Sequence, residues 1–230
     1  MYELFTVATV IIIIALLWLL VRAFRAVAAA QKTDWGKTWL NYIDGLNSLF
    51  CKYYHRLQYT PIDLPAQGAA IVVANHLSGL DGLLVIAATR RPLRFLIARE
   101  DYERFGLTWL FRATGSIPVD RSRHPEIALR AALRALEAGE VIALFPQGRM
   151  ILPGETRKLK RGAFWLAQKT NTPIYPAFMS GIAGVGHIFR GILWRSHAKL
   201  VSYPPLDWRN ENNAEYLQTL FDGKMGVGKE

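Results

Sequence analysis

The side chains best suited to chemistry are a histidine and an aspartate five positions apart, His76 and Asp81. Residues on one face of a helix lie three or four positions apart, so Asp81 reaches His76 only if Ser78-Gly79 forms a turn. A carboxylate bonded to one ring nitrogen would fix the tautomer and leave the other nitrogen free to deprotonate a hydroxyl. A histidine that only caps a turn explains the same spacing, so the pair alone does not decide between the two.

A second segment, Gly115-Ser116-Ile117-Pro118-Val119-Asp120-Arg121, carries an arginine to the end of a short apolar run. The guanidinium of Arg121 could bind a phosphate through two parallel hydrogen bonds. A surface arginine paired with Asp120 is the alternative interpretation.

A third segment, Phe145-Pro146-Gln147-Gly148-Arg149, follows another apolar run. Pro146 ends the expected strand, and Gly148 permits a close approach of the backbone. Arg149 begins a basic stretch that leads into an expected helix start, where side chains and amide groups can together bind an anion. Its other members are Arg157, Lys158, Lys160 and Arg161. A solvated face or a membrane-contact patch would account for the same charges.

The elements that must position these residues alternate between short apolar runs and helical patterns. Strands are expected at 69–74, 93–98, 116–119, 141–145, 173–178 and 198–203, and helices at 81–89, 100–113, 125–138 and 160–170. This alternation predicts an α/β fold with a largely parallel sheet flanked by helices. Such sheets bind ligands beyond the carboxyl ends of their strands, where the three segments are expected to lie.

The N-terminal region contains an uncharged apolar run at residues 4–21, near the lower length limit of a membrane-spanning helix. A cleaved signal peptide would have a basic start, whereas Glu3 precedes this run, and a buried core helix would show a polar side. Basic residues follow the run, which places the rest of the chain in the cytoplasm by the positive-inside tendency. They are Arg22, Arg25, Lys32 and Lys37. We therefore expect a single membrane anchor and an interfacial helix in residues 1–60 and a cytoplasmic globular domain in residues 61–230.

The expected interfacial helix lies in residues 35–59, where aromatic side chains have basic neighbours. Its apolar residues recur at helical spacing: Trp39, Ile43, Leu46, Phe50, Tyr53 or Tyr54, and Leu57. A helix at the membrane surface and a helix packed on the globular domain fit this stripe equally.

The composition of the chain limits which classes of partner are expected. Lys and Arg number 28 against 18 Asp and Glu, a formal net charge of +10, so anionic partners are expected. The apolar N-terminus favours lipid, and no nucleic-acid-binding module is recognisable, so nucleic acid is not an expected partner. Cys51 is the single cysteine, and the five histidines lack zinc-ligand spacing, so neither a disulfide, a metal nor another cofactor is expected.

In this order and at these separations, the segments resemble the blocks of the glycerolipid acyltransferase superfamily, over about residues 68–181. The resemblance implies that His76 is the general base, that Asp81 orients it, and that the acceptor phosphate is held by Arg121 and Arg149. The implied substrate-binding set also contains Asn75, Gln147, Gly148, Lys158 and Lys160.

The same resemblance implies what residues 61–230 do. They would form a catalytic domain that moves a fatty acyl group from acyl-CoA or acyl-carrier protein to the hydroxyl of a membrane lipid, with 1-acylglycerol-3-phosphate as the expected acceptor. Backbone amides near the first block would stabilise the oxyanion. On this basis, Asp81→Asn is expected to cut turnover sharply with little loss of folding.

The third block departs from the family pattern Phe-Pro-Glu-Gly-Thr-Arg-Ser, because Gln147 replaces Glu and Arg149 stands one position early. Gln keeps the shape and the hydrogen bonding but lacks the charge. A lyso-ornithine or glycosylated lipid acceptor therefore stays open. A thioester hydrolase that uses the same pair on water and a non-catalytic lipid-binding homologue stay open too, whereas a serine hydrolase is disfavoured because no Gly-x-Ser-x-Gly motif occurs.

Overall fold

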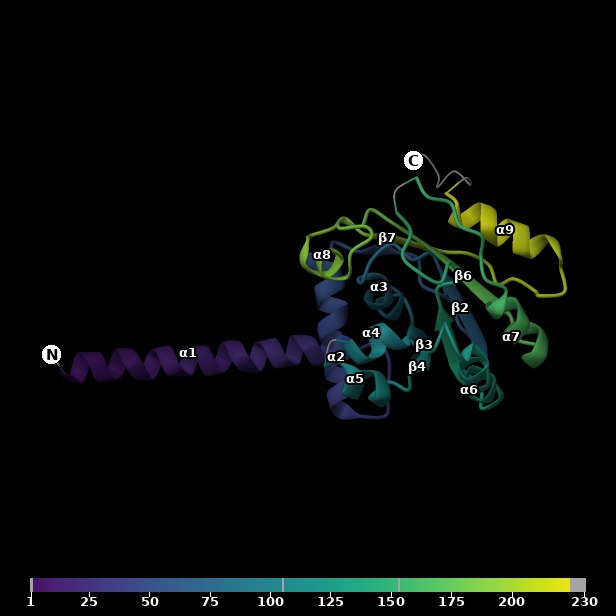
Figure 1. Cartoon of the computed structure of the whole chain (residues 1–230). Coiled ribbons are helices and arrows are strands. Elements are labelled where there is room, and N and C mark those ends of the chain that lie inside the picture. The colour runs from purple at the N-terminus through teal and green to yellow at the C-terminus, as the bar shows by residue number, and fades with distance from the viewer. Residues whose placement is uncertain (1, 105, 153, 224–230) are drawn as a thin grey trace.

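Figure 1 shows a twisted sheet covered by helices on both faces, with one long helix projecting from it. The structure, a computed structural model, describes residues 2–104, 106–152 and 154–223.

The described residues form a sheet in the order β1-β7-β6-β2-β5-β3-β4. Strands β6, β2, β5, β3 and β4 run parallel to one another, β7 is antiparallel to β6, and β1 is parallel to β7. The bounds are β1 Gln58–Tyr59, β2 Ala70–Ala74, β3 Leu93–Ala98, β4 Ile117–Val119, β5 Val141–Leu144, β6 Ile174–Ser180 and β7 Lys199–Ser202. The predicted α/β fold with a largely parallel sheet is therefore confirmed.

The central strand β2 explains how the sheet separates two cores. Successive side chains of a strand point to opposite faces, and both faces of a parallel sheet are covered. Ala70, Val72 and Ala74 pack in the core beneath α3, and Ile71 and Val73 pack in the core formed with α6, α7 and α9. The helices on the sheet are α3 Asp81–Ala87, α4 Arg99–Arg104, α5 Thr108–Ala113, α6 Pro125–Glu137, α7 Gly162–Thr170, α8 Ile188–Leu193 and α9 Asn212–Phe221.

The single helix predicted over residues 100–113 is wrong. Helix α4 ends at Arg104 and α5 begins at Thr108. Between them Gly106 has a φ of +64°, a left-handed conformation that ends a helix and that glycine adopts without steric cost. Helices α8 and α9 were not expected from the sequence pattern.

The N-terminal helix α1 (Tyr2–Ala29) leaves the globular part at one end of the molecule (Figure 1). Its segment Phe5–Ala29 is long and apolar enough to cross a membrane, and its most apolar stretch is not buried. Helix α2 (Thr38–Leu49) crosses it closely, since a Cβ on Gly45 would lie 2.1 Å from the carbonyl oxygen of Val27.

Helix α2 buries a mostly polar side, and the π-helical turn η1 (Phe50–Tyr54) that follows it buries Cys51. The buried residues of α2 include Asp44, Asn47 and Ser48, and the Asp44 carboxylate accepts hydrogen bonds from the Lys32 and Thr33 amides. The outward side exposes most of the predicted apolar stripe: Trp39, Ile43, Leu46, Tyr53 and Tyr54. The helix therefore packs on the globular part through Leu40 and polar groups such as Asn47, while much of its apolar stripe stays exposed.

Candidate active site

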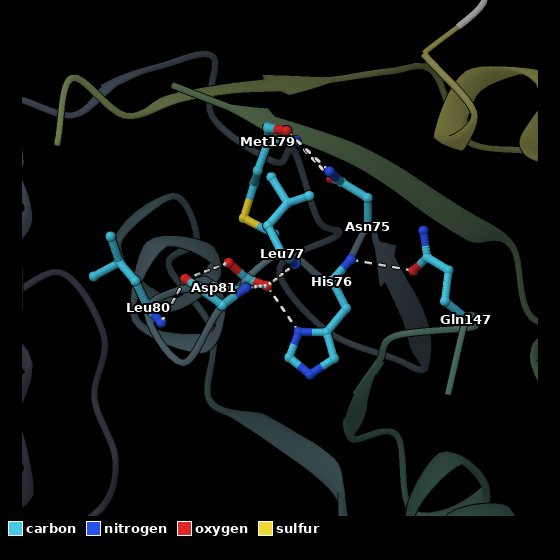
Figure 2. Close-up of polar contacts among 8 residues, drawn as sticks. Asn75, His76, Leu77, Leu80, Asp81, Gln147 and Met179 are labelled. Atoms are coloured by element: carbon cyan, nitrogen blue, oxygen red, sulfur yellow. Dashed lines mark hydrogen bonds and ion pairs between the residues drawn. The ribbon is translucent and has the colours of Figure 1, made fainter. Parts of the chain in front are cut away.

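Asp81 begins α3 and folds back onto His76 through the turn expected at Ser78-Gly79 (Figure 2). Its buried carboxylate accepts a hydrogen bond from Nδ1 of His76 at 2.7 Å. It also accepts from the amides of Leu77 and Ser78 and from the Ser78 hydroxyl. A carboxylate only accepts hydrogen bonds, so Nδ1 carries the proton and Nε2 presents a lone pair.

The imidazole is held on a second side by Phe145. The two rings are stacked with centroids 4.3 Å apart and 12° between their planes. The His76 side chain keeps 23% of its surface exposed, and no described residue bonds to its Nε2. Nε2 is therefore oriented and accessible, as a general base requires.

The ring lies in the wall of a cavity of about 390 Å³ whose surface is mostly apolar. Apolar side chains from α2, α3, β3 and α5 line it, among them Leu40, Ile43, Leu83, Ile86, Phe95, Leu110 and Phe111. Arg121 and Gly148 line the same cavity, which thus joins a basic side chain, an oriented histidine and space for an apolar chain.

Four backbone amides of the first block already have acceptors. The amide of His76 donates to Oε1 of Gln147 at 3.1 Å, those of Leu77 and Ser78 donate to Asp81, and that of Gly79 donates to the His187 carbonyl at 3.5 Å. These amides hold the turn together, and the source of the oxyanion donors stays a prediction.

Two residues predicted to bind substrate contact the protein itself. Asn75 is buried, and its side-chain amide donates to the Met179 carbonyl at 2.9 Å and accepts from the Met179 amide at 2.7 Å. Gln147 is buried and accepts from the His76 amide (Figure 2). Both contacts hold the end of β2 where His76 lies, and a contact of either residue with substrate stays a prediction.

The arginines differ in their surroundings. Arg121 lines the cavity, while the neighbouring Asp120 carboxylate accepts from the amides of Ser122 and Arg123 and from the Ser122 hydroxyl. These hydrogen bonds, that from the Arg123 amide foremost, lower the pKa of Asp120. Asp120 therefore closes its own turn.

Arg149 does not reach the cavity in this structure. Its guanidinium pairs with Glu155 and donates to the Met150 carbonyl. The sequence placed both partners in the same basic stretch but could not show that they neutralise each other.

Lys160 reaches Gly148 of the third block, which lines the cavity. Gly148 has a φ of +76°, and a Cβ there would lie 2.6 Å from Cε and 2.9 Å from Nζ of Lys160. The Lys160 amide donates to the Pro146 carbonyl at 2.8 Å, which fixes this approach. Lys158 is exposed.

Sequence reasoning assigned no role to Phe145 and treated Ser78 only as a turn residue. The sequence offered one indication of the ring contact with His76: the aromatic residue Phe145 stands directly before Pro146, where the expected strand ends. Among the described residues, no group of three or more His, Cys, Asp or Glu side chains could hold a metal ion.

Comparison with known families decides the class of chemistry. The acyltransferase family model matches residues 56–180, more than half of the chain. The chain belongs to this acyltransferase family. The resemblance to glycerolipid acyltransferases drawn from the ordered blocks is thereby confirmed.

Curated relatives of this acyltransferase agree with the family model. The chain is 24% identical over 149 residues to the 1-acyl-sn-glycerol-3-phosphate acyltransferase of Bacillus subtilis, and the alignment covers 64% of this chain and 72% of that protein. It is 31% identical over 134 residues to a probable 1-acyl-sn-glycerol-3-phosphate acyltransferase of Mycoplasma pneumoniae, covering 54% of this chain and 48% of that protein. The chain thus spans about half the length of the second relative.

The fold has a solved counterpart. The crystal structure of the 1-acyl-sn-glycerophosphate acyltransferase PlsC from Thermotoga maritima aligns with a TM-score of 0.63 at 19% identity, covering 82% of each chain. This likeness shows that the two chains share a fold.

Proposed function

We propose that this acyltransferase moves a fatty acyl group from acyl-CoA or acyl-carrier protein to the hydroxyl of a lysophospholipid, with 1-acylglycerol-3-phosphate as the favoured acceptor. The hydrogen bond between His76 Nδ1 and Asp81, which leaves Nε2 as a base in the cavity wall, carries this proposal. The names of the relatives support the acceptor.

The chemistry follows from the orientation of the imidazole. Nε2 of His76 removes the proton of the acceptor hydroxyl as its oxygen attacks the thioester carbonyl carbon. The tetrahedral intermediate collapses, the C–S bond breaks, and the imidazolium returns its proton to the thiolate. Asp81 stabilises the imidazolium between these steps, in the role that a carboxylate plays beside a catalytic histidine. No covalent acyl-enzyme is needed.

The substrate groups divide between the apolar and basic parts of the site. The acyl chain occupies the cavity of about 390 Å³, where burial of its methylene groups supplies binding energy. Arg121 and Lys160 hold the acceptor phosphate, and Lys158 adds positive potential. Arg149 joins them only if its pair with Glu155 opens.

The reaction takes place at a membrane in this proposal. Helix α1 anchors the chain, the exposed stripe of α2 lies in the interface, and the basic residues that follow the apolar run of α1 keep residues 61–230 on the cytoplasmic side. The bilayer then serves as the acceptor reservoir.

The decisive experiment incubates the purified full chain in lipid nanodiscs with labelled acyl-CoA or acyl-carrier protein and one lysolipid at a time. The panel contains 1-acylglycerol-3-phosphate, other lysophospholipids, a lyso-ornithine lipid and a glycosylated lipid, and products are identified by mass spectrometry. Acylated lipid that disappears in His76→Ala supports the proposal. Free fatty acid formed regardless of acceptor would instead identify a hydrolase, and product formation unchanged in His76→Ala would exclude His76 as the base.

A further inference from the structure

Helix α8 packs directly on the turn that carries His76 and Asp81. A Cβ on Gly79 would lie 2.6 Å from the Ile188 carbonyl oxygen, and one on Gly191 would lie 2.5 Å from Cβ of Ser78. The Gly186 amide donates to the Leu77 carbonyl at 2.7 Å. Glycines on both partners thus bring α8 into backbone contact with the turn, so a displacement of α8 would be transmitted to it.

The two sides of α8 differ in their surroundings. Ile188 and Ile192 line the cavity that contains His76. The other side is open, since Leu193 is 66% exposed and the adjoining Trp194 is 53% exposed. Phe189 is 57% exposed on the same helix. Large exposed apolar side chains gathered in one short segment indicate a surface that binds a membrane or another protein.

The position of α8 indicates which of the two it contacts. The Tyr54 hydroxyl of η1 donates to the Leu193 carbonyl at 2.6 Å, and Nε of Arg195 donates to the Tyr54 carbonyl at 3.2 Å. The α8 surface is therefore continuous with the exposed stripe of α2 and η1. Figure 1 shows α8 and α2 at the end of the molecule from which α1 leaves, whereas α9 lies at the opposite end.

The charge of this part of the chain favours an anionic surface. Residues 187–199, which include α8, contain three Lys or Arg (Arg190, Arg195 and Lys199) and no Asp or Glu. The Arg190 guanidinium lies over the Trp194 ring, 5.3 Å from its centroid. Arginine beside tryptophan at an exposed apolar surface is the composition of a membrane-water interface.

We propose that α8 and Trp194 form a second membrane-docking element, which inserts Leu193 and Trp194 into the interfacial layer of an anionic bilayer. Docking holds the cavity wall formed by Ile188 and Ile192 at the lipid surface. An acceptor lipid then passes from the leaflet into the cavity. The inference deepens the proposed function, on whose membrane location it rests. An acidic carrier protein that binds the same surface is the competing occupant.

A labelling experiment tests the contact without reference to catalysis. Cys51 is fully buried, and burial raises the pKa of its thiol to about 12, so a cysteine introduced at Leu193 is labelled selectively at neutral pH. The full chain carrying Leu193→Cys with an environment-sensitive fluorophore is reconstituted in vesicles of phosphatidylcholine and phosphatidylglycerol that contain a nitroxide-labelled lipid. Glu215→Cys on α9 is the control, because Glu215 is exposed at the opposite end.

We expect strong quenching at position 193 and little at position 215. Equal quenching at both positions, or none at 193, would overturn the proposal. A label at 193 that is unquenched by lipid and responds only to added acyl-carrier protein would overturn it in favour of a protein-docking surface.

A functional comparison separates docking from a merely structural role. In Leu193→Gln/Trp194→Gln, the mole fraction of acceptor lipid that gives half-maximal rate should rise about fivefold, while turnover of a short-chain, water-soluble acceptor should stay within about twofold. The control is Ile127→Gln on α6, which removes a comparably exposed side chain elsewhere. An equal loss on both acceptors would overturn the docking role. If the unmodified chain acylates neither acceptor, the proposed function fails, and the quenching result still decides the docking.

Discussion

Phe145 and His76 stack face to face with their ring centroids 4.3 Å apart. The Asp81 hydrogen bond fixes one edge of the imidazole, but a single bond permits the ring to tilt about it. The parallel ring of Phe145 removes that freedom on one face, so two contacts together direct Nε2.

Replacing Phe145 with leucine should therefore lower kcat more than it lowers stability. We expect a loss of about 1–2 kcal/mol in the free energy of unfolding, measured with urea, and about a tenfold fall in kcat with little change in KM. Phe221→Leu, at the buried end of α9, is the control that should lose similar stability and keep kcat. An unchanged kcat in Phe145→Leu would show that the stack does not orient the base.

Asp81→Asn tests the pair itself. The amide cannot hold Nδ1–H in the same way, so kcat should fall about a thousandfold in steady-state assays. The structure also revises the expectation of little effect on folding, because the Asp81 carboxylate accepts bonds from His76, Leu77 and Ser78 that the amide of asparagine cannot all replace. The free energy of unfolding should fall by about 2–3 kcal/mol. Turnover at the normal rate would refute the assigned role.

Gly148→Ala tests whether the close approach of Lys160 matters for the acceptor. Alanine at a φ of +76° is strained, and its Cβ would also displace the end of Lys160. Gly36→Ala is a matched control, because Gly36 has a φ of +72° with nothing within 4 Å. Both variants should lose about 1 kcal/mol in urea unfolding, but only Gly148→Ala should raise the acceptor KM. An equal acceptor KM in the two variants would count against Lys160 as a phosphate ligand.

The sequence predicted the parts of the fold that local patterns determine. The run at residues 69–74 is apolar on both faces because β2 lies in the middle of the sheet, and this pattern identifies a buried strand without further information. The spacing of His76 and Asp81 likewise predicted their contact, because residues of the turn itself, Leu77 and Ser78, bond to the Asp81 carboxylate and fold it back.

The parts that the sequence did not predict depend on contacts between distant segments. Helix α8 has six residues and no periodic pattern long enough to identify, and its place is set by glycines at 79 and 191. The withdrawal of Arg149 from the cavity depends on its pair with Glu155, six positions along a loop whose path the sequence does not reveal. The apolar stripe of α2 could be read from the sequence, but not that polar residues would form the buried side.

Arg121→Ala tests the second predicted phosphate ligand. Loss of a forked, charge-assisted contact should raise the KM for a phosphate-bearing acceptor about tenfold or more and leave the KM for the acyl donor unchanged. The control is Arg123→Ala two positions later, which removes the same charge from a residue that does not line the cavity. An effect of Arg121→Ala confined to the donor would contradict the assignment.

Gln147→Glu restores the residue that the family pattern has at this position. Its carboxylate could still accept from the His76 amide, which Gln147 does at 3.1 Å, but it would place a negative charge in a site that is 2% exposed. A nearby carboxylate stabilises an imidazolium, so a higher pH is needed to free the base, and the acid limb of the kcat/KM profile should move up by about one pH unit. Burial of the charge should lower the free energy of unfolding by about 1–3 kcal/mol at pH 7.

Gln147→Ala provides the matched control for this change, because it removes the acceptor without adding charge. It should lose stability and leave the pH profile in place. Since Gln147 contacts the His76 backbone and does not line the cavity, neither variant should change which lysolipid is preferred in the acceptor panel. A changed lysolipid preference in Gln147→Glu, together with an unchanged pH profile, would show that this position determines headgroup specificity. It would then not act by setting the charge around the base.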